Sequence, residues 1–411
     1  MLMGDNMTRK INEIIDNIYW VGVIDYDLKV FDIIMETEFG TTYNSYLVVG
    51  SEKTALIDTA KAEFKDEYLD RIREIVDIKD IDYLILNHTE PDHSGSVKYI
   101  VEENPNIEIF ATTPALMNLK EIINMPFKAN KVTKGLSLSL GDKTLEFFLQ
   151  PHLHWPDTMF TYIKEDNFLF TCDFFGSHYA TDKILAKNLT DKDTYLRTVK
   201  EYFEAIMHPF LPYVRNGLDR VKQINPDYIA VSHGVTLDKS LMGKIITIYD
   251  ELSVIPEKPD KPLVLIPFAS AYGYTEKMAT IIKETIEAEM DNEVYIELFD
   301  LIFTDVKEII KKVPVCDALL IGSSTIVRDT VKVIWDLLAG IDFEMTKGKL
   351  ASAFGSYGWS GEAVENIIQR EKQLRFKTVD GLRIKFDPSE SQIEEVKEYG
   401  REIAKLLIKK W

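Results

Sequence analysis

Cysteine is nearly absent from this chain of 411 residues, which contains only Cys172 and Cys316. Two cysteines exclude a disulfide framework, a four-cysteine rubredoxin-type metal site and an iron–sulfur cluster held by cysteines of this chain alone. Positive charge is also in deficit, since the net charge is −19. Such a chain is poorly suited to bind nucleic acid or an anionic membrane. Long apolar runs are missing too: no segment approaches the roughly 18 apolar residues of a membrane-spanning helix.

The first ten residues contain no apolar segment of the kind found in export signals. Together with the scarcity of cysteine, this predicts a cytoplasmic protein. The apolar content of 45% and charged content of 28% are ordinary for a soluble globular protein.

The length of the chain exceeds the size at which one core usually keeps growing, so we expect two domains. The boundary is marked by Pro256, Pro259 and Pro262, which indicate a stiff extended linker. We therefore predict a first domain over residues 1–255, a linker over 256–262 and a second domain over 263–411.

The stretch 88–93 of the first domain contains four side chains that can bind a metal: His88, Glu90, Asp92 and His93. It directly follows the apolar run 83–86, which predicts a buried strand. Side chains on a loop after a strand can converge on one point. The alternative is a polar loop whose histidines only cap the following helix, and that explanation suits one histidine better than this cluster.

Three further predicted strands are followed by potential ligands. His152 and His154 come after 145–149, Asp173 after 168–171, and His233 after 228–232. His152 and His154 would point the same way if the strand continued that far, so both compete for one role. Because the chain has only seven histidines, their concentration at strand ends predicts a metal site.

Two further residues of the first domain have two interpretations each. Asp58, at the end of the predicted strand 54–58, either orients a ligand imidazole or caps a helix. His178, five residues after Asp173, is either a proton donor in the pocket or a structural residue.

From residue 263 onward, predicted strands alternate regularly with helices. The five strands cover 263–266, 294–298, 318–321, 350–354 and 382–386. This alternation predicts an α/β domain with a doubly wound parallel sheet of flavodoxin type.

Three loops rich in small residues follow strands that should end on one edge of that sheet. The loop 270–275 opens the first helix and has the form of the flavodoxin phosphate loop, Ser/Thr-x-Thr-Gly-x-Thr, with Tyr272 departing from the pattern. Backbone N–H groups at a helix N-terminus bind phosphate well. A single small-residue loop could be a tight turn, whereas three at successive strands predict an FMN site. The expected FMN contacts are Ser270, Tyr272, Gly273, Tyr274, Thr275, Ser323, Ser324, Thr325, Ser356, Tyr357, Gly358 and Trp359.

The ligand pattern of the first domain resembles the metallo-β-lactamase fold, an αββα sandwich that usually holds two zinc ions through His-x-His-x-Asp-His. Glu90 here replaces the second histidine, and a carboxylate favours iron over zinc. With the loops 154–157 (His-Trp-Pro-Asp) and 232–234 (Ser-His-Gly), the chain resembles the flavodiiron proteins, or A-type flavoproteins, over nearly its whole length.

The resemblance implies FMN and two non-haem irons in each chain. One iron is expected at His88, Glu90 and His154, and the other at Asp92, His93 and His233, with Asp173 between them. In some members of the family the residue matching His93 is displaced by solvent.

The activity implied by the resemblance is reduction of O₂ to water, which takes four electrons, two stored by FMN and two by the iron pair. The resemblance also implies a head-to-tail homodimer or a tetramer built from two dimers, with electrons crossing from one chain's flavin to the other's irons. Electron donors in the family are rubredoxin-like proteins or reduced coenzyme F-420. The motifs 154–159 and 354–361 look closest to the methanogen branch and so favour a coenzyme F-420 oxidase. That anionic coenzyme would require a local basic patch, for which Arg328, Lys332 and Arg375 are candidates.

Other functions remain open at this point. A nitric oxide reductase or a rubredoxin-dependent oxygen reductase would use the same residues. A zinc hydrolase joined to a flavodoxin is disfavoured by Glu90. A pure electron carrier is disfavoured by the complete ligand set.

Overall fold

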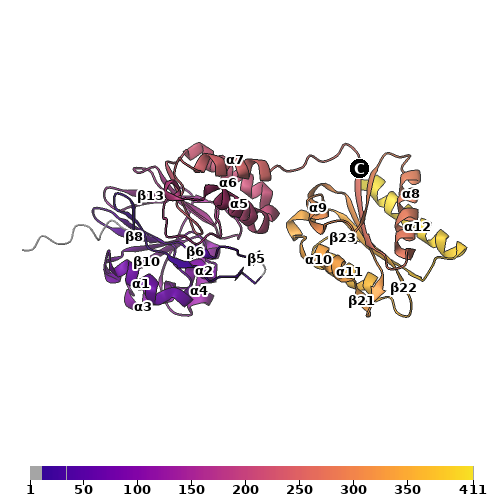
Figure 1. Cartoon of the computed structure of the whole chain (residues 1–411), viewed down its shortest axis with the longest axis horizontal. Coiled ribbons are helices and arrows are strands. Elements are labelled where there is room, and N and C mark those ends of the chain that lie inside the picture. Colours follow the sequence, from indigo (N-terminus) through magenta and orange to yellow (C-terminus); the bar gives the residue numbers. More distant parts are fainter. Residues whose placement is uncertain (1–11, 34, 411) are drawn as a thin grey trace, which may run out of the picture. The chain divides into compact units, whose positions relative to one another are not determined.

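The computed structural model describes residues 12–33 and 35–410. The chain divides into two compact units, Met1–Val254 and Ile255–Trp411 (Figure 1). The first ten residues, on which the expectation about an export signal rests, lie outside the described residues. Within the described ranges, none of the helices is long and apolar enough to cross a membrane.

The first unit contains two sheets. The seven-stranded sheet has the order β1-β2-β7-β8-β9-β10-β11 and the five-stranded sheet has the order β12-β13-β14-β15-β16. The strands of the first are β1 (Glu13–Ile15), β2 (Ile18–Trp20), β7 (Tyr46–Val49), β8 (Thr54–Ile57), β9 (Tyr83–Leu86), β10 (Glu108–Ala111) and β11 (Lys128–Lys131). Those of the second are β12 (Ser137–Ser139), β13 (Thr144–Leu149), β14 (Met159–Ile163), β15 (Phe168–Cys172) and β16 (Tyr228–Val231).

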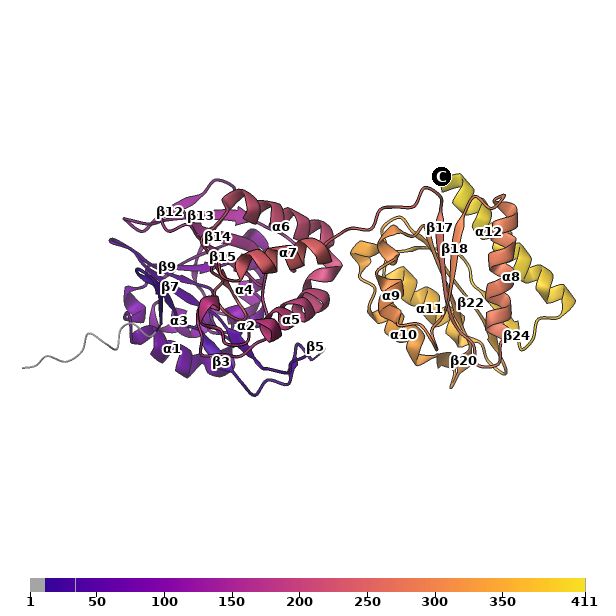
Figure 2. The ribbon, with the colours of Figure 1, turned by 45° about the horizontal axis from the view of Figure 1, so that its top comes forward.

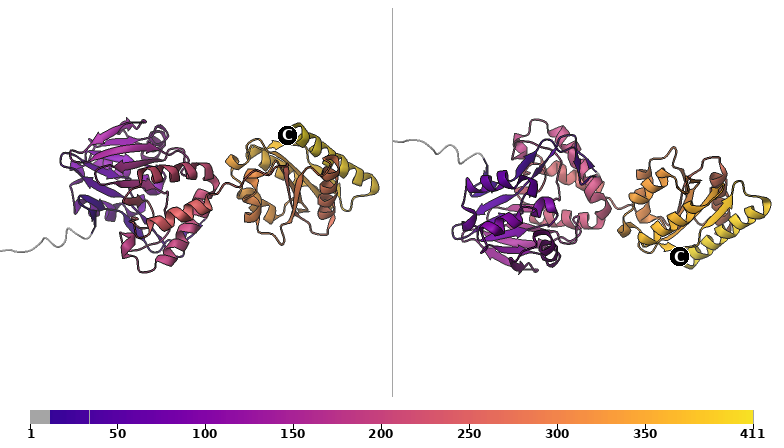
Figure 3. Two further views of the ribbon diagram at one scale, coloured as in Figure 1. Left: turned by 90° about the horizontal axis from the view of Figure 1, so that it is seen from above. Right: turned by 90° about the horizontal axis from the view of Figure 1, so that it is seen from below.

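Helices cover the outer face of each sheet. Beside the first sheet lie α1 (Lys65–Arg73), α3 (Val97–Glu103) and α4 (Thr113–Ile123), whose apolar residues form one core with that sheet. Beside the second lie α5 (Lys192–Tyr202), α6 (Leu211–Ile224) and α7 (Met242–Leu252), with a core of their own. A third core joins the inner faces of the two sheets, for example Ile57 and Ile85 with Phe170. The layers are visible in Figure 3. The predicted αββα sandwich of metallo-β-lactamase type is therefore confirmed.

The segment 41–49 contains two strands, β6 (Thr41–Tyr43) and β7. The break falls at Asn44, whose side-chain amide donates to the carbonyl oxygens of Val231 and Gly234, both at 2.8 Å. The side-chain oxygen of Asn44 accepts from Trp20 Nε1 at 2.8 Å. Asn44 thereby fastens this turn to the loop that carries His233.

The second unit is built on one parallel sheet with the order β18-β17-β19-β22, and β24 pairs with the far side of β22. These strands are β17 (Leu263–Ala269), β18 (Tyr295–Asp300), β19 (Ala318–Ser323), β22 (Leu350–Tyr357) and β24 (Leu382–Lys385), with the short β23 (Lys377–Thr378) also on β22. In chain order this is the 2-1-3-4-5 arrangement of flavodoxin-like sheets. The predicted fold of this domain is confirmed.

Helices lie on both faces of this sheet. On one face, α8 (Tyr274–Glu289) and α12 (Glu390–Lys410) share a core. On the other lie α9 (Val306–Ile310), α10 (Lys332–Ala339) and α11 (Glu362–Gln373). Figure 2 shows α8 and α12 side by side. Gly400 of α12 permits their close approach, since an added Cβ would lie 3.0 Å from Cβ of Thr285 in α8.

Candidate metal centre and flavin site

The stretch 88–93 does not form an open loop throughout. After β9 the chain passes His88 and Glu90 and then forms the one-turn helix α2 (Pro91–Ser94), which contains Asp92 and His93. Pro91 suits the first position of a helix because its fixed φ is helical and no N–H is needed there. This turn brings four of the predicted ligands onto one edge of the first sheet.

Asp173 lies at the centre of the predicted ligands. Its Oδ2 lies 3.7 Å from Nε2 of His88 and 3.6 Å from Nε2 of His154. Its Oδ1 lies 3.0 Å from Nε2 of His93 and 3.4 Å from Nε2 of His233. Each carboxylate oxygen therefore faces a different pair of imidazoles, which is the arrangement a bridging carboxylate requires.

The other two acidic residues complete two separate groups. Glu90 Oε2 lies 3.2 Å from Nε2 of both His88 and His154. Asp92 Oδ2 lies 3.3 Å from His93 Nε2 and 3.1 Å from His233 Nε2. Within each group the potential ligand atoms lie within 4.8 Å of one another. All seven metal ligands predicted from the sequence are thus brought together.

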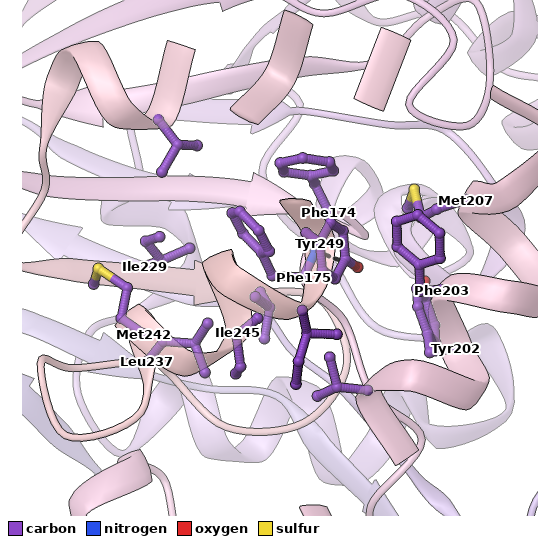
Figure 4. Close-up of a cluster of buried hydrophobic side chains, with 14 of the residues drawn as sticks. Phe174, Phe175, Tyr202, Phe203, Met207, Ile229, Leu237, Met242, Ile245 and Tyr249 are labelled. Atoms are coloured by element: carbon purple, nitrogen blue, oxygen red, sulfur yellow. Dashed lines mark hydrogen bonds between the residues drawn. The ribbon is translucent and has the colours of Figure 1, made fainter. Parts of the chain in front are cut away.

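Buried apolar residues hold the turn that carries Asp173. Phe174 and Phe175 follow it directly and are fully buried. Figure 4 shows both rings beside Tyr249 of α7. The backbone N–H of Phe175 donates to Tyr249 Oη at 3.0 Å. Packing against the second sheet's helices therefore fixes the direction of the Asp173 side chain.

His233 is fixed by backbone contacts on both sides. Its Nδ1 lies 2.7 Å from the carbonyl oxygen of Thr42, which leaves Nε2 facing Asp92 and Asp173. Gly234 follows with φ of +90°, and a Cβ there would lie 2.5 Å from Tyr195 Oη. Glycine is therefore required at this position for two independent reasons.

His152 does not compete with His154, because β13 ends at Leu149 and the chain turns before either residue. His152 has φ of +65° and its ring packs on Tyr213 at 4.6 Å between centroids. Asp58 does not cap a helix. Its carboxylate accepts from the backbone and side-chain nitrogens of Asn87, at 2.7 and 2.9 Å, and its charge interacts with His93 and His88 without a hydrogen bond to either in the described ranges.

His178 lies beside the metal centre. Its Nδ1 is 2.9 Å from Thr41 Oγ1, and its ring packs on Phe31 at 4.2 Å and lies 5.1 Å from that of His233. Its Nε2 is buried and has no hydrogen-bond partner in the described part of the chain. Burial, reinforced by His233, lowers the pKa of His178 well below its usual value. The imidazole is therefore neutral, and proton donation from an imidazolium at this position is disfavoured.

The acidic and imidazole groups stabilise one another's charged forms. Burial acts to lower the pKa of His93, but the charges of Asp92 and Asp173 outweigh it and raise the pKa to about 10. Burial likewise acts to raise the pKa of Asp173, and the surrounding imidazoles hold it well below the usual range. A bound cation would replace the imidazole protons and balance the charge of the three carboxylates.

The donor set fits a pair of iron ions. Four imidazoles and three carboxylates converge. Imidazole and carboxylate ligands are typical of non-haem iron, whereas thiolate ligands select softer metals. Neither oxygen of Asp92 has a hydrogen-bond partner among the described residues, although the residue is buried. Buried polar atoms without partners are rare in proteins, and a metal ion would satisfy these.

Cys172 also lies near His93 and Asp173, but it does not fit as a ligand. Its Sγ accepts a hydrogen bond from Ser232 Oγ at 3.0 Å, and burial raises the pKa of the thiol well above its usual value. Metals bind the thiolate form of cysteine, so the neutral thiol belongs to the support of the site.

Two acidic residues at the centre have roles that sequence reasoning missed. Asp157 Oδ1 lies 3.0 Å from Nδ1 of His88, a contact that the motif 154–157 does not reveal. Asp32, in the turn between β4 (Val30–Phe31) and β5 (Met35–Glu36), lies near Glu90. Asp32 is an exposed residue, and partial desolvation of its carboxyl together with the Glu90 charge raises its pKa to about 7. No spacing or motif marks Asp32, because it reaches the centre from a distant hairpin.

In the second unit, hydrogen bonds join the three predicted flavin loops. Thr275 is buried at the start of α8, and its Oγ1 lies 3.4 Å from Ser324 Oγ and 3.3 Å from Ser356 Oγ. The N–H of Ala271 donates to Ser324 Oγ at 3.1 Å. Ser270 Oγ accepts from the N–H of Glu276, in the first turn of α8, at 3.3 Å. The carboxyl ends of β17, β19 and β22 thus form one polar site.

A cavity of about 290 Å³ lies at the same edge of the sheet and is lined by Thr325, Val327, Gly358, Trp359 and Phe386. Val327 and Trp359 are 86% and 81% exposed. An open apolar cavity beside a polar phosphate-type site fits a flavin ring and its ribityl phosphate. Val327 and Phe386 were not anticipated, since a hairpin turn and the end of β24 carry no flavin motif.

Three of the remaining predicted FMN contacts lie in strands and not in loops. Ser323 is the last residue of β19, and Ser356 and Tyr357 end β22, so the loops after these two strands begin later than expected. Ser323 Oγ donates to the Ser324 carbonyl oxygen at 2.9 Å. Gly273 has φ of +81° where α8 begins, directly before Tyr274, and Tyr272 is 84% exposed.

Comparison with known proteins finds a matching family for each unit. The family described as ODP family beta lactamase matches residues 41–234, and the flavodoxin family matches residues 266–400. The chain is 42% identical over 395 residues to the flavo-diiron protein FprA2 of Clostridium acetobutylicum, covering 95% of this chain and 98% of that one. It is 34% identical over 397 residues to a nitric oxide reductase of Moorella thermoacetica, covering 95% and 97%.

Among solved structures, the rubredoxin oxygen:oxidoreductase from Desulfovibrio gigas is similar, with a TM-score of 0.64 and 28% identity. The match covers 97% of this chain and 98% of that one.

The chain belongs to the flavodiiron protein family. It is an oxidoreductase that carries FMN in its flavodoxin-like unit and a non-haem diiron centre in its metallo-β-lactamase-like unit.

Proposed function

We propose that the seven converging residues hold the two irons of this protein. His88, Glu90 and His154 would bind one, Asp92, His93 and His233 the other, and Asp173 would bridge them. The position of Asp173, with one oxygen toward each group, is the observation that carries this assignment. His93 is included because its Nε2 lies 3.0 Å from Asp173 Oδ1.

We propose that the protein reduces O₂ to water: O₂ takes up four electrons and four protons and gives two waters. When bound, FMN and the iron pair each supply two electrons for this reaction. Phe31, Tyr202 and His178 pack around His233 and shield that side of the centre from water, whereas Glu90 and His154 stay partly accessible. A store of four electrons at one partly shielded site supports reduction without release of peroxide.

His178 is proposed to donate a hydrogen bond to the substrate from a neutral ring. If Thr41 Oγ1 donates to Nδ1, the proton of the neutral ring lies on Nε2, which has no other partner in the described part of the chain. His178→Gln should then slow O₂ reduction while iron and FMN contents stay normal. An unchanged rate would assign His178 a structural role.

Nitric oxide is a second candidate substrate. Two NO, two electrons and two protons give N₂O and water, which the same site could support. The similarity to a nitric oxide reductase over 95% of the chain favours this candidate. The ligand residues alone do not separate the two activities.

The proposed electron donor is reduced coenzyme F-420, on the basis of the motifs 154–159 and 354–361. Its binding would require positive charge near the flavin cavity, and Arg328 lies next to Val327, which lines that cavity. Lys332 is already paired with Asp336, and Arg375 packs over Phe343. A rubredoxin-like donor is the alternative, favoured by the name of the similar oxidoreductase from Desulfovibrio gigas.

We also propose a head-to-tail homodimer, in which one chain's flavin serves the partner's irons. The high exposure of Val327 and Trp359 at the flavin cavity supports a covering partner. Complementation tests it: Asp173→Asn chains mixed with Thr275→Ala chains should regain activity in mixed dimers. Absence of any gain after mixed dimers have formed would contradict electron transfer between chains.

The activity is tested by a single turnover. Protein containing FMN and two irons is reduced anaerobically by four electrons and mixed with limiting O₂, while peroxide is monitored. The expected result is four electrons consumed for each O₂ and no peroxide. Two electrons for each O₂ with equal peroxide would contradict the proposal, and Asp173→Asn with FMN alone is the control that should produce peroxide. A parallel experiment with NO compares rates.

The donor is tested separately by mixing oxidised protein with reduced coenzyme F-420 or with a reduced rubredoxin under anaerobic conditions. Rapid flavin reduction by the coenzyme would support the first donor. Reduction by rubredoxin alone would replace it with the second.

A further inference from the structure

The imidazoles of the metal centre differ in what supports their Nδ1 atoms. His88 Nδ1 lies 3.0 Å from a carboxylate oxygen of Asp157. His233 Nδ1 lies 2.7 Å from the neutral carbonyl oxygen of Thr42. His93 Nδ1 is buried without a hydrogen-bond partner in the described residues. Of these three Nδ1 atoms, only that of His88 faces a negatively charged group.

Asp157 is held rigidly in this position. It is fully buried, and its Oδ2 accepts hydrogen bonds from the backbone N–H of Thr89 at 2.9 Å and from Thr89 Oγ1 at 2.6 Å. Asn118 of α4 donates to Thr89 Oγ1 at 3.1 Å, and Thr112 Oγ1 donates to the Asp157 carbonyl oxygen at 2.8 Å. The Asp157 carboxylate is therefore fixed by the loop after β9 and by α4 and its N-cap.

A carboxylate at Nδ1 has two effects on an imidazole. It holds the proton on Nδ1, which leaves the lone pair on Nε2, and it makes that nitrogen a stronger electron donor to a metal. A neutral carbonyl oxygen has the first effect and less of the second. His88 Nε2 faces Glu90 and Asp173, so this gain would apply to the metal position of His88, Glu90 and His154.

We propose that Asp157 is a positioning residue that selectively strengthens metal binding at the position of His88, Glu90 and His154. The inference rests on the ligand assignment made above. It makes the two iron positions inequivalent. Iron at the His88 position is bound more tightly than it would be without the Asp157 carboxylate. The more electron-rich imidazole also lowers the reduction potential of that iron.

Asp157→Asn is the sharpest substitution because its shape is conserved. If the amide oxygen faces His88, the amide N–H₂ takes the place of Oδ2. The N–H and the hydroxyl of Thr89 then both lose the oxygen that accepts their hydrogen bonds. If the amide flips, its N–H₂ faces His88 Nδ1 and selects the tautomer with the proton on Nε2, which cannot bind a metal. Either orientation weakens the same metal position.

The test is anaerobic titration of metal-free, FMN-containing protein with Fe(II). Wild type should bind two equivalents, and Asp157→Asn should weaken one binding step by about 10–100-fold while the other step and the FMN content stay unchanged. The reduction potential of one iron should rise in the same variant. Thr89→Val keeps the charge of Asp157 and removes one of the two hydrogen bonds to its Oδ2, together with the bond from Asn118, so it should have a smaller effect. Asp142→Asn, on an exposed loop, should have none.

Two measurements keep this proposal distinct from the ligand assignment. If wild type fails to bind two equivalents, the assignment fails and Asp157 is not at issue. If wild type binds two and Asp157→Asn leaves both steps unchanged, or weakens both equally, the selective role of Asp157 is overturned.

A wild-type measurement covers the case in which Asp157→Asn does not fold. In ¹⁵N-histidine-labelled protein loaded with Zn(II), one ligand Nδ1–H should resonate clearly downfield of the others, as expected for a bond to a carboxylate. Equivalent resonances for all the ligand histidines would overturn the proposal.

Discussion

Asp92 Oδ2 lies 3.1 Å from Nε2 of His233, yet neither oxygen of Asp92 takes part in a hydrogen bond among the described residues. Two buried polar groups so close together, without a hydrogen bond between them, are arranged to meet a third partner. Asp173 differs, since its Oδ1 lies within hydrogen-bond distance of His93 Nε2 at 3.0 Å while its Oδ2 faces the other group of ligands. The unsatisfied oxygens of Asp92 are therefore the clearest sign that the centre is arranged to bind ions.

Asp173→Asn should abolish the tightly bound iron pair, because an amide has one oxygen and cannot bridge as a carboxylate does. Iron would be measured by elemental analysis of protein purified with its FMN. Asp238→Asn is the matched control, since Asp238 is also buried and accepts backbone N–H groups of Lys187 and Ser240 away from the centre. Normal iron content in Asp173→Asn would remove Asp173 from the bridge.

Removal of iron by an anaerobic chelator should lower the melting temperature of the first unit. Three carboxylates lie together in this centre, and after loss of the cations only protonated imidazoles such as that of His93 balance their charge. A ligand at 100 times its dissociation constant stabilises a fold by about 2.7 kcal/mol, which sets the scale for each iron. The measurement is calorimetry with and without metal, and equal transitions in the two states would count against a structural contribution of the metal.

Thr275→Ala should weaken FMN retention about tenfold or more, because a hydrogen bond to a charged group contributes about 1.5–3 kcal/mol. Thr275 is buried where the three flavin loops meet. Thr280→Ala on the same helix is the control, since Thr280 is exposed and its hydroxyl donates only to the Glu276 carbonyl oxygen. Flavin content after gel filtration distinguishes them, and equal retention would argue against the phosphate-loop assignment.

Glu371→Gln should stabilise the protein at alkaline pH. Glu371 of α11 is fully buried without a hydrogen-bond partner in the described residues, and burial raises its pKa well above the usual value. A raised folded-state pKa gives stability that is present below the unfolded pKa and is lost as pH rises toward the folded one, by about 1.4 kcal/mol per pH unit. Glu371→Gln has no carboxyl to ionise, so its stability does not fall with pH for this reason.

The difference in melting temperature between Glu371→Gln and wild type should therefore be positive at pH 8 and shrink toward pH 5. Glu365→Gln, on the exposed side of the same helix, should show no such trend. A difference independent of pH would mean that Glu371 is not protonated in the folded protein.

The fold was predictable because its signals are periodic. The buried strands, and the alternation of strands and helices after Leu263, follow from apolar patterns within short stretches of sequence. The break at Asn44 was not predictable, since it depends on hydrogen bonds to Val231 and Gly234, which are distant in sequence.

Within the candidate site, residues that follow strands were predictable, because strand ends on one edge bring them together. The partners that orient these residues were harder to identify. Asp58 contacts Asn87 rather than an imidazole, while Asp157 supports His88 from the other sheet. A carboxylate's partner depends on how the two sheets pack, and no local pattern encodes that packing.

The central claim is that the two groups of ligands bind an iron pair bridged by Asp173. The most direct measurement is an anomalous difference map from crystals of the iron-loaded protein, recorded at the iron absorption edge. We expect two peaks, one between His88, Glu90 and His154 and one between Asp92, His93 and His233, with Asp173 contacting both. A single peak, or anomalous signal at the zinc edge instead of the iron edge, would contradict the account.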